Sequence, residues 1–337
     1  FKAAPLVGIP GTVVDVRSEN CIETTTEKVD PKVVSEMMTR GMCTLTGEKK
    51  VADAWRRFIV PSDVVGIKVN CSGAPKVCSN PYVVAEIVRN LTAIGVKPDN
   101  IWIYERFDNQ LESVNYNKYM DQPVNVYAVE VPRGSIRNYD PEVYAEVNFF
   151  GEEDTRSFMI RHVARKFTKV INIPNMKDHG AAGVTGCLKN IAYGNFSNVA
   201  RSHRYEKTNT KTFIGVLANI EPLRSKTVLH VMDGMKGVWH GGPFVLKPEF
   251  VFYPKRMMFG TDPVAMDRLL IDIIEDKRKE KGAVSVWDRS KDNLIDRRSD
   301  DPLKNRFIRE PGHIEYASTL GLGLYDKSKI KVREIAL

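Results

Sequence analysis

The chain has 337 residues, 42% of them hydrophobic and 27% charged, which suits a globular protein with a large core and excludes a small disulfide-stapled scaffold. No apolar stretch approaches the ~20 residues that cross a bilayer, so we expect no membrane span. Because Lys and Arg alternate with acidic residues, the net charge of +8 predicts no nucleic acid partner and favours a small anionic ligand or an acidic protein partner.

Short runs rich in β-branched residues recur along the chain, with helical patterns between several of them. The predicted strands are Thr12–Val16, Val64–Val69, Ile101–Tyr104, Val124–Val131, Lys169–Ile173 and Thr227–Met232. This alternation predicts an α/β fold of mostly parallel sheets with flanking helices. No linker-like stretch divides the chain, so we predict a single domain over residues 1–337 with two interleaved lobes around a cleft.

Capping residues mark the predicted helices. One begins at Pro81 and stops at Gly95, because proline suits the first turn of a helix and glycine its end. A second covers Val184 to Tyr193. The dipeptide Asp262-Pro263 announces a third, late helix. The mixed-charge run from Glu275 to Lys281 indicates a solvated helix end.

The segment after the predicted strand Lys169–Ile173 combines glycines with polar side chains, and we predict a binding site at this glycine-rich loop, 174–203. Ligands of open α/β sheets lie beyond the carboxyl ends of strands, where backbone N–H groups and helix N-termini attract anions. We expect His179, His203 and Lys189 to be catalytic, and Lys177, Thr185 and Asn190 to bind substrate. The alternative is that the glycines serve tight turns and both lysines are solvated.

Residues at the ends of two other predicted strands are expected to line the same site. Lys68 and Asn70 share a face of the strand Val64–Val69 by its two-residue period, and His240 follows the strand Thr227–Met232. All three are predicted to contact substrate.

A metal site is a separate possibility. Asp233 ends the same strand that His240 follows. With His179 and His203 it forms a candidate ligand set for a divalent transition metal, although no tight ligand spacing supports it.

The five cysteines form no C-x-x-C pair, so the sequence contains no iron–sulfur motif, and it contains no nucleotide-binding motif either. Cys71 and Cys78 flank a Ser-Gly-Ala-Pro turn. An oxidising compartment would allow a disulfide between them, and Cys71 is a candidate nucleophile if Lys68 lowers its pKa. The alternative is that both are small buried hydrophobic residues.

Several of these segments together resemble the family with domain of unknown function 362. The similar segments are Ile67 to Cys71, Lys177 to Asn190, Asp233 with His240 to Pro243, and Thr261 to Asp267. The resemblance covers most of the chain, from about Val64 to Gly323. It implies an α/β fold, and similar members often carry a twin-arginine export leader, which implies a periplasmic or extracellular protein. Phe1 at the start of the chain fits a removed leader.

A more distant similarity is to the lactate racemase family, in which a glycine-rich segment precedes a lysine that tethers a nickel cofactor, and a ligating histidine follows. Lys189 and His203 have comparable order here, but Cys187-Leu188 replaces glycine and arginine, and the helix that leads to His203 is shorter.

From the predicted site and the family resemblance together, we expect an exported enzyme or enzyme-like protein that binds a small anionic or carbonyl substrate, with or without a metal. The alternative is a non-catalytic binding protein or a subunit of a larger complex.

Overall fold

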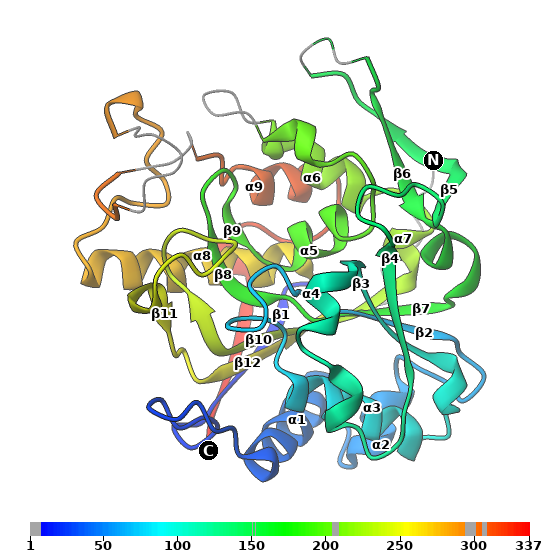
Figure 1. The fold of residues 1–337 in the computed structure, drawn as a ribbon. Coiled ribbons are helices and arrows are strands. Elements are labelled where there is room, and N and C mark those ends of the chain that lie inside the picture. Colours follow the sequence, from blue (N-terminus) through cyan, green and yellow to red (C-terminus); the bar gives the residue numbers. More distant parts are fainter. Residues whose placement is uncertain (1–7, 150, 152, 204–208, 294–300, 305–308) are drawn as a thin grey trace.

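One large twisted sheet organises the computed structural model, which describes residues 8–149, 151, 153–203, 209–293, 301–304 and 309–337 and so leaves Phe1 outside the described residues (Figure 1). In spatial order its main strands are β13 (Lys331–Ala336), β1 (Thr12–Arg17), β12 (Arg256–Gly260), β10 (Thr227–Val238), β7 (Lys169–Asn172), β2 (Val65–Lys68), β3 (Ile101–Phe107) and β4 (Asn125–Glu130). Strands β10, β7, β2, β3 and β4 run parallel, while β12 runs antiparallel to both neighbours. The predicted α/β fold with a mostly parallel sheet is confirmed.

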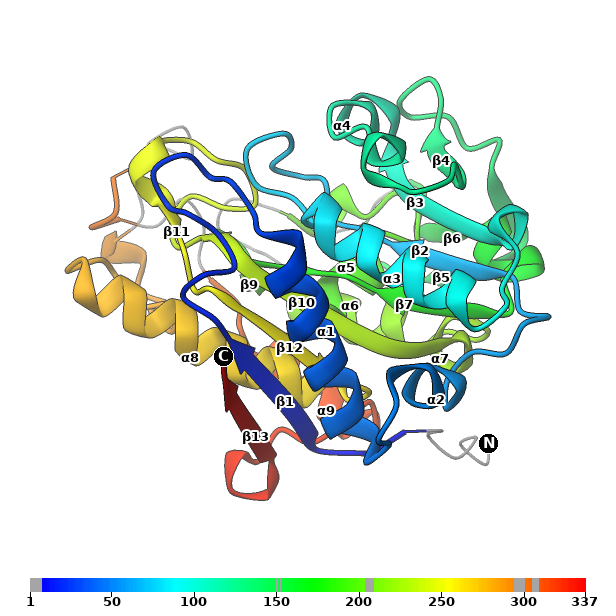
Figure 2. The same ribbon diagram turned by 90° about the horizontal axis from the view of Figure 1, so that it is seen from below.

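Helices cover both faces of this sheet (Figures 1 and 2). One face carries α1 (Pro31–Thr46), α2 (Val51–Arg56) and α3 (Pro81–Ala93), and the other carries α5 (Cys187–Tyr193), α6 (Thr210–Ala218), α8 (Pro263–Glu280) and α9 (His313–Thr319). Two hydrophobic clusters fill these layers, and neighbouring strand residues such as Val170 and Ile171 belong to different clusters. The sheet is therefore buried on both sides, which explains its almost wholly apolar central strands.

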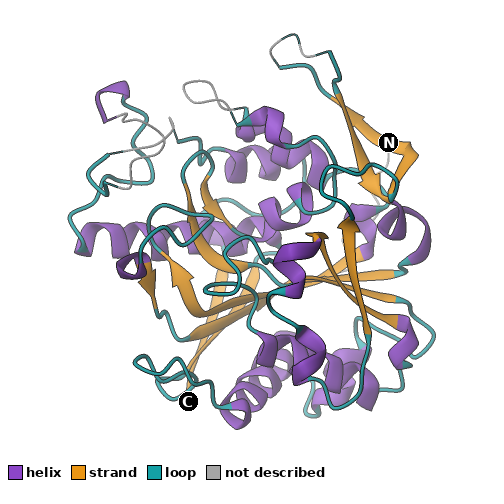
Figure 3. Ribbon diagram, viewed as in Figure 1, coloured by secondary structure: helices purple, strands orange, loops and turns teal. Residues whose placement is uncertain are grey.

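Figure 3 shows the strands of the sheet in orange between purple helices. Further elements lie outside this arrangement of layers. They are α4 (Asp108–Glu112), α7 (Leu223–Lys226), β11 (Val251–Phe252), and a two-stranded hairpin of β5 (Tyr139–Glu146) and β6 (Arg156–Ile160) that projects from the body. Across the described ranges, no helix combines the length and the apolar character that a membrane crossing requires.

Local signals predicted several element boundaries well. Every predicted strand is present, and α3 and α8 begin at Pro81 and Pro263 as expected. Their N-cap side chains, Asn80 and Asp262, accept hydrogen bonds from backbone N–H groups of the first turn. These boundaries depend on residues adjacent in sequence, which is why the pattern alone predicts them.

The glycine-rich segment differs from the prediction of a loop followed by a helix from Val184. It forms a hairpin of β8 (Asn175–His179) and β9 (Gly183–Thr185), and β8 also pairs with β10. Gly183 has φ +80°, a conformation that suits glycine and turns the hairpin. Helix α5 begins only at Cys187, so the predicted start was wrong by three residues.

An aspartate from a distant helix holds the N-terminus of α5. The Asp267 carboxylate of α8 accepts hydrogen bonds from the backbone N–H groups of Cys187 (2.6 Å) and Leu188 (2.9 Å). Gly186 leaves room for it, because a Cβ there would lie 2.0 Å from Asp267 Oδ1. The positive end of α5 is therefore bound by the protein's own carboxylate.

The run from Glu275 to Lys281 is only partly solvated, because Arg278 is fully buried. Its guanidinium lies 3.5 Å from Asp178 and 3.0 Å from Nδ1 of His240. Arg309 contacts the same Asp178 oxygen at 2.5 Å. Although burial alone raises the pKa of Asp178, the two arginines hold it below its usual value. The prediction that this helix end is solvated was wrong for Arg278. Its partner, Asp178, lies 100 residues away in sequence, so the local pattern gives no sign of the contact.

We expect Asp267→Asn to lower the free energy of unfolding at pH 8 by about 1–3 kcal/mol, because an amide NH₂ would replace an acceptor oxygen and face a buried backbone N–H. Urea denaturation followed by circular dichroism measures this change. The control is Asp272→Asn on the same helix, whose partly exposed ion pairs with Arg268 and Lys327 contribute less than about 1 kcal/mol. Equal effects of the two substitutions would contradict the proposed capping role.

Candidate active site

A cavity of about 420 Å³ lies at the carboxyl ends of β2 and β3. The hairpin of β8 and β9, helix α5, the segment that ends at His203, and the loop after β10 complete its walls. Its lining includes Lys68, Asn70, Glu105, Arg106, Phe107, Arg133, His179, Thr185, Lys189, Asn190, Tyr193, Val199, His203 and Phe244. The position agrees with the rule that ligands of parallel sheets bind beyond the carboxyl ends of strands.

Most of the site residues predicted from the sequence lie together around this cavity. Lys68, Asn70, His179, Thr185, Lys189, Asn190 and His203 line the cavity, whereas Lys177, Asp233 and His240 do not. The Asp233 carboxylate accepts hydrogen bonds from backbone N–H groups of Asn80 and Met235. Among the described residues no group of three or more His, Cys, Asp or Glu side chains is arranged to hold a metal ion.

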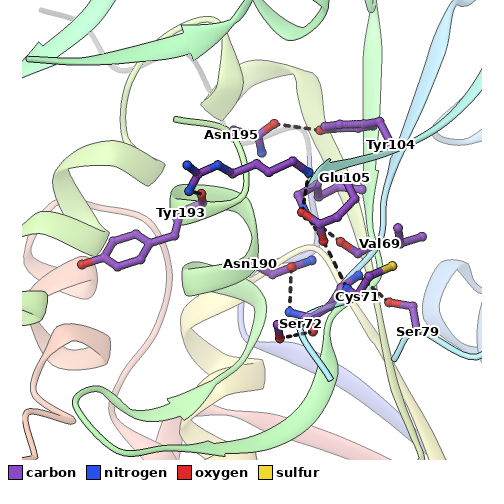
Figure 4. Close-up of polar contacts among 12 residues, drawn as sticks. Val69, Cys71, Ser72, Ser79, Tyr104, Glu105, Asn190, Tyr193 and Asn195 are labelled. Carbon is purple, nitrogen blue, oxygen red and sulfur yellow. Dashed lines mark hydrogen bonds and ion pairs between the residues drawn. The ribbon is translucent and has the colours of Figure 1, made fainter. Parts of the chain in front are cut away.

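Lys68 forms a buried ion pair at one wall. Its Nζ lies 2.9 Å from Oε2 of Glu105 and donates to the carbonyl oxygen of Val69 at 2.5 Å. The same Glu105 oxygen accepts from the backbone N–H of Cys71, a contact drawn in Figure 4. A Cβ on Gly194 would lie 2.1 Å from Lys68 Cε, so any larger residue at this position would clash with the lysine side chain. The positive charge of Lys68 is therefore neutralised by the protein itself.

Buried amides connect this wall to α5. Asn190 accepts a hydrogen bond from Asn70 at 3.1 Å and donates to Asn172 at 2.8 Å. Figure 4 shows Asn190 reaching from α5 toward the loop that carries Ser72. Lys177 Nζ donates to Asn70 Oδ1 at 2.7 Å and to the carbonyl oxygen of Val77 at 3.0 Å. Burial lowers the pKa of Lys177 to about 8, but its amine is occupied by these acceptors.

The two predicted histidines lie next to each other. The ring centroids of His179 and His203 are 5.2 Å apart, and that of His203 is 5.3 Å from the Tyr193 ring. His179 Nδ1 accepts hydrogen bonds from the N–H groups of Ala181 and Ala182 at 3.2 and 3.1 Å. Burial lowers the pKa of both rings, with Lys189 as the next cause, and that of His203 falls to about 3. His179 is therefore neutral and carries its ring proton on Nε2.

Lys189 projects from α5 with its Nζ 4.6 Å from the centroid of the Tyr193 ring. In the described part of the chain its amine has no hydrogen-bond acceptor and no carboxylate partner. Burial, followed by the positive charge of Arg106, lowers the pKa of Lys189 to about 7. Both the charged and the uncharged form of this amine are therefore expected near neutral pH.

Two arginines of the cavity were missed by the sequence reasoning. Arg106 follows Glu105 on β3 and pairs with Glu130 at 2.6 Å. Arg133 lies in the exposed loop after β4, with its guanidinium 4.4 Å from the centroid of the Phe107 ring. The signal for Arg106 was its position at a predicted strand end, next to Glu105. The position of Arg133 has no such local signal, because it depends on how the loop folds back.

The cysteines are free thiols in the structure. Cys71 Sγ lies 3.6 Å from the Tyr116 hydroxyl, and burial raises the pKa of Cys71 well above its usual value, with Glu105 adding to the shift. Burial also raises the pKa of Cys78 to about 11. The condition for a nucleophilic Cys71 is therefore not met, because desolvation outweighs the lowering of its pKa by the nearby Lys68 ammonium.

Comparison with known proteins gives one family match. The model of the family described as Domain of unknown function (DUF362) matches residues 65–272. A crystal structure of a protein from Thermotoga maritima, solved by a structural genomics consortium, aligns at 10% identity with a TM-score of 0.39. The alignment covers 75% of this chain and 59% of that protein, so the chain spans less than two thirds of its length. No curated protein sequence matches the chain.

Lys189→Met should raise the free energy of unfolding at pH 7 by about 2–4 kcal/mol, and the gain should shrink toward zero by pH 10. The folded pKa near 7 lies below the ordinary lysine value of 10.5. The unfolded chain therefore binds more protons between these values, and the wild type gains stability as pH rises. Urea denaturation at both pH values measures the difference. The exposed Lys211→Met on α6 serves as control, and a loss of stability with Lys189→Met at both pH values would contradict the argument.

Proposed function

Since the chain belongs to the family with domain of unknown function 362, whose description names no activity, we propose its function from the cavity: it is an enzyme that acts on a small anionic, carbonyl-bearing substrate. The substrate occupies the cavity that Lys68, His179 and Lys189 line. Its anionic group lies toward Arg133, and its carbonyl group lies toward Lys189 and the two histidines.

The balance of charge in the cavity carries this proposal. Of the cations that line it, Lys68 is paired with Glu105 and Arg106 with Glu130. Within the described residues, Arg133 has no carboxylate partner, and neither has Lys189 in the fraction of molecules in which its amine is protonated. A cavity with unmatched cations attracts an anionic ligand and repels a cationic one. A guanidinium also suits a carboxylate, which it binds through two parallel hydrogen bonds.

The uncharged donors of the cavity support the second half of the proposal. The neutral His179 offers Nε2–H, and the Thr185 hydroxyl is buried without a hydrogen-bond partner in the described structure. Such donors hold a carbonyl oxygen and its developing charge without the cost of moving water. The apolar surfaces of Phe107, Val199 and Phe244 complete a cavity of the size that suits a small molecule.

Export to the periplasm or outside the cell, a bound transition metal, a cofactor tethered to Lys189 and an acidic protein partner stay predictions. Export and the tethered cofactor rest on family resemblance, and the other two rest on sequence pattern. Cell fractionation tests the first, and intact mass with elemental analysis of native protein tests the second and third.

Arg133→Gln should weaken the binding of pyruvate by about tenfold or more, because a charge-assisted hydrogen bond contributes about 1.5–3 kcal/mol. Isothermal titration calorimetry at fixed ionic strength and pH 7.5 measures the dissociation constant. Acetone, which has the carbonyl group but no charge, should bind both proteins equally.

The matched control for this test is Arg137→Gln. Arg137 is an exposed arginine of the same loop and does not line the cavity. It should leave pyruvate binding unchanged. Equal weakening by both substitutions would indicate a general effect of net charge, and the absence of pyruvate, 2-oxobutyrate and acetoacetate binding by the wild type would overturn the proposed function.

A further inference from the structure

Three buried lysines lie in or near the cavity, and their amines differ in their hydrogen-bond and ion-pair partners. Lys68 is neutralised by Glu105 at 2.9 Å. Lys177 donates to two oxygens, at 2.7 and 3.0 Å, and lies outside the cavity lining. Lys189 lines the cavity and has neither a carboxylate nor an acceptor in the described part of the chain. Because no described oxygen accepts a hydrogen bond from the Lys189 amine, this amine is available to contact a ligand.

The groups around Lys189 favour its uncharged form. Arg106 approaches from β3, His179 from β8, His203 from the segment after α5, and His313 from α9. None of these groups carries a negative charge. The face of the Tyr193 ring, 4.6 Å from Nζ, favours the ammonium, but burial lowers the pKa of Lys189 nevertheless. In a buried site, cationic and neutral neighbours raise the cost of an ammonium and leave the amine lone pair available. A desolvated amine near another cation is a recognised form of activated nucleophile.

His179 is oriented to assist attack on a carbonyl group. Its Nδ1 accepts two backbone hydrogen bonds, so the proton of the neutral ring is on Nε2. A neutral N–H donor stabilises the oxygen of a carbonyl under attack without protonating the amine. The His203 ring lies 5.2 Å away between centroids and also lines the cavity.

We infer that Lys189 is a covalent catalyst that forms an imine with the carbonyl carbon of a short oxo carboxylic acid. This inference rests on the proposed function and names its substrate class and first chemical step. Nζ attacks the carbonyl carbon, a C–N bond forms, and the π electrons of the carbonyl pass to oxygen. Both amine protons pass in turn to that oxygen through solvent water, and a water molecule leaves, so that Nζ is joined to carbon by a C=N bond.

The imine activates the atoms next to it. Once protonated by solvent, it withdraws electrons from the adjacent carbon–hydrogen or carbon–carboxylate bond. The class of reaction that follows is thus proton exchange next to the carbonyl carbon or loss of carbon dioxide from a 3-oxo acid.

Borohydride trapping tests the inference directly. The full chain is incubated with pyruvate or acetoacetate at pH 7.5, reduced, digested and analysed by peptide mass spectrometry. Hydride converts the C=N bond to a stable secondary amine, so the adduct remains on the lysine that formed it. We expect the peptide containing Lys189 to be labelled at least ~10-fold faster than the peptides of exposed lysines such as Lys211.

This comparison lies within one protein and does not depend on the folding of a variant. Lys189→Met should abolish the fast adduct, and Lys189→Arg should do the same while it keeps the positive charge. Arg133→Gln should slow labelling by the factor that it removes from pyruvate affinity.

The outcomes separate the two proposals. Pyruvate binding in calorimetry without preferential labelling of Lys189 overturns the imine and leaves the proposed function intact. Labelling of Lys189 by acetone as fast as by pyruvate supports the imine but contradicts the role of charge in the proposed function. Absence of both binding and labelling overturns both proposals.

Discussion

The buried carboxylate of Asp178 is the contact on which the geometry of the cavity depends. It joins β8 to α8 through Arg278, to the segment before α9 through Arg309, and to the loop after β10 through the N–H of Gly242 at 3.2 Å. Removing one partner of a buried ion pair costs about 3–5 kcal/mol, because the other charge stays buried. His179 follows Asp178 directly, so this network sets the position of the imidazole that faces the ligand.

Sequence reasoning predicted the parts of the fold that have local causes. The caps Asn80 and Asp262 and the β-branched runs act on their own neighbours, and they predicted α3, α8 and the central strands. The hairpin of β8 and β9 was missed, because its glycines and polar residues resemble a loop until β10 pairs with it. Burial of Arg278 was missed for the same reason, since its partner lies far away in sequence.

The candidate site was predicted in part. Lys68 and Asn70 meet the segment of His179 because β2 and β7 are neighbours in a parallel sheet, and strand ends of such a sheet converge. Sequence alone did not separate Lys177 from Lys189. Both lie in the same glycine-rich segment, but the Lys177 amine donates to Asn70, whereas the Lys189 amine has no hydrogen-bond acceptor in the described structure and contacts the face of the Tyr193 ring. Contacts, rather than residue type, decide which lysine is available for chemistry.

The Asp267 cap bears on how the protein discriminates among anions. Helix N-termini at sheet edges commonly bind phosphate through backbone N–H groups that donate hydrogen bonds to any small oxyanion. Here those groups at the start of α5 are occupied by the protein's own carboxylate. Inorganic phosphate and sulfate therefore lose the binding mode that they use most often. Side chains must therefore recognise the anion, and their length and shape can distinguish one carboxylic acid from another.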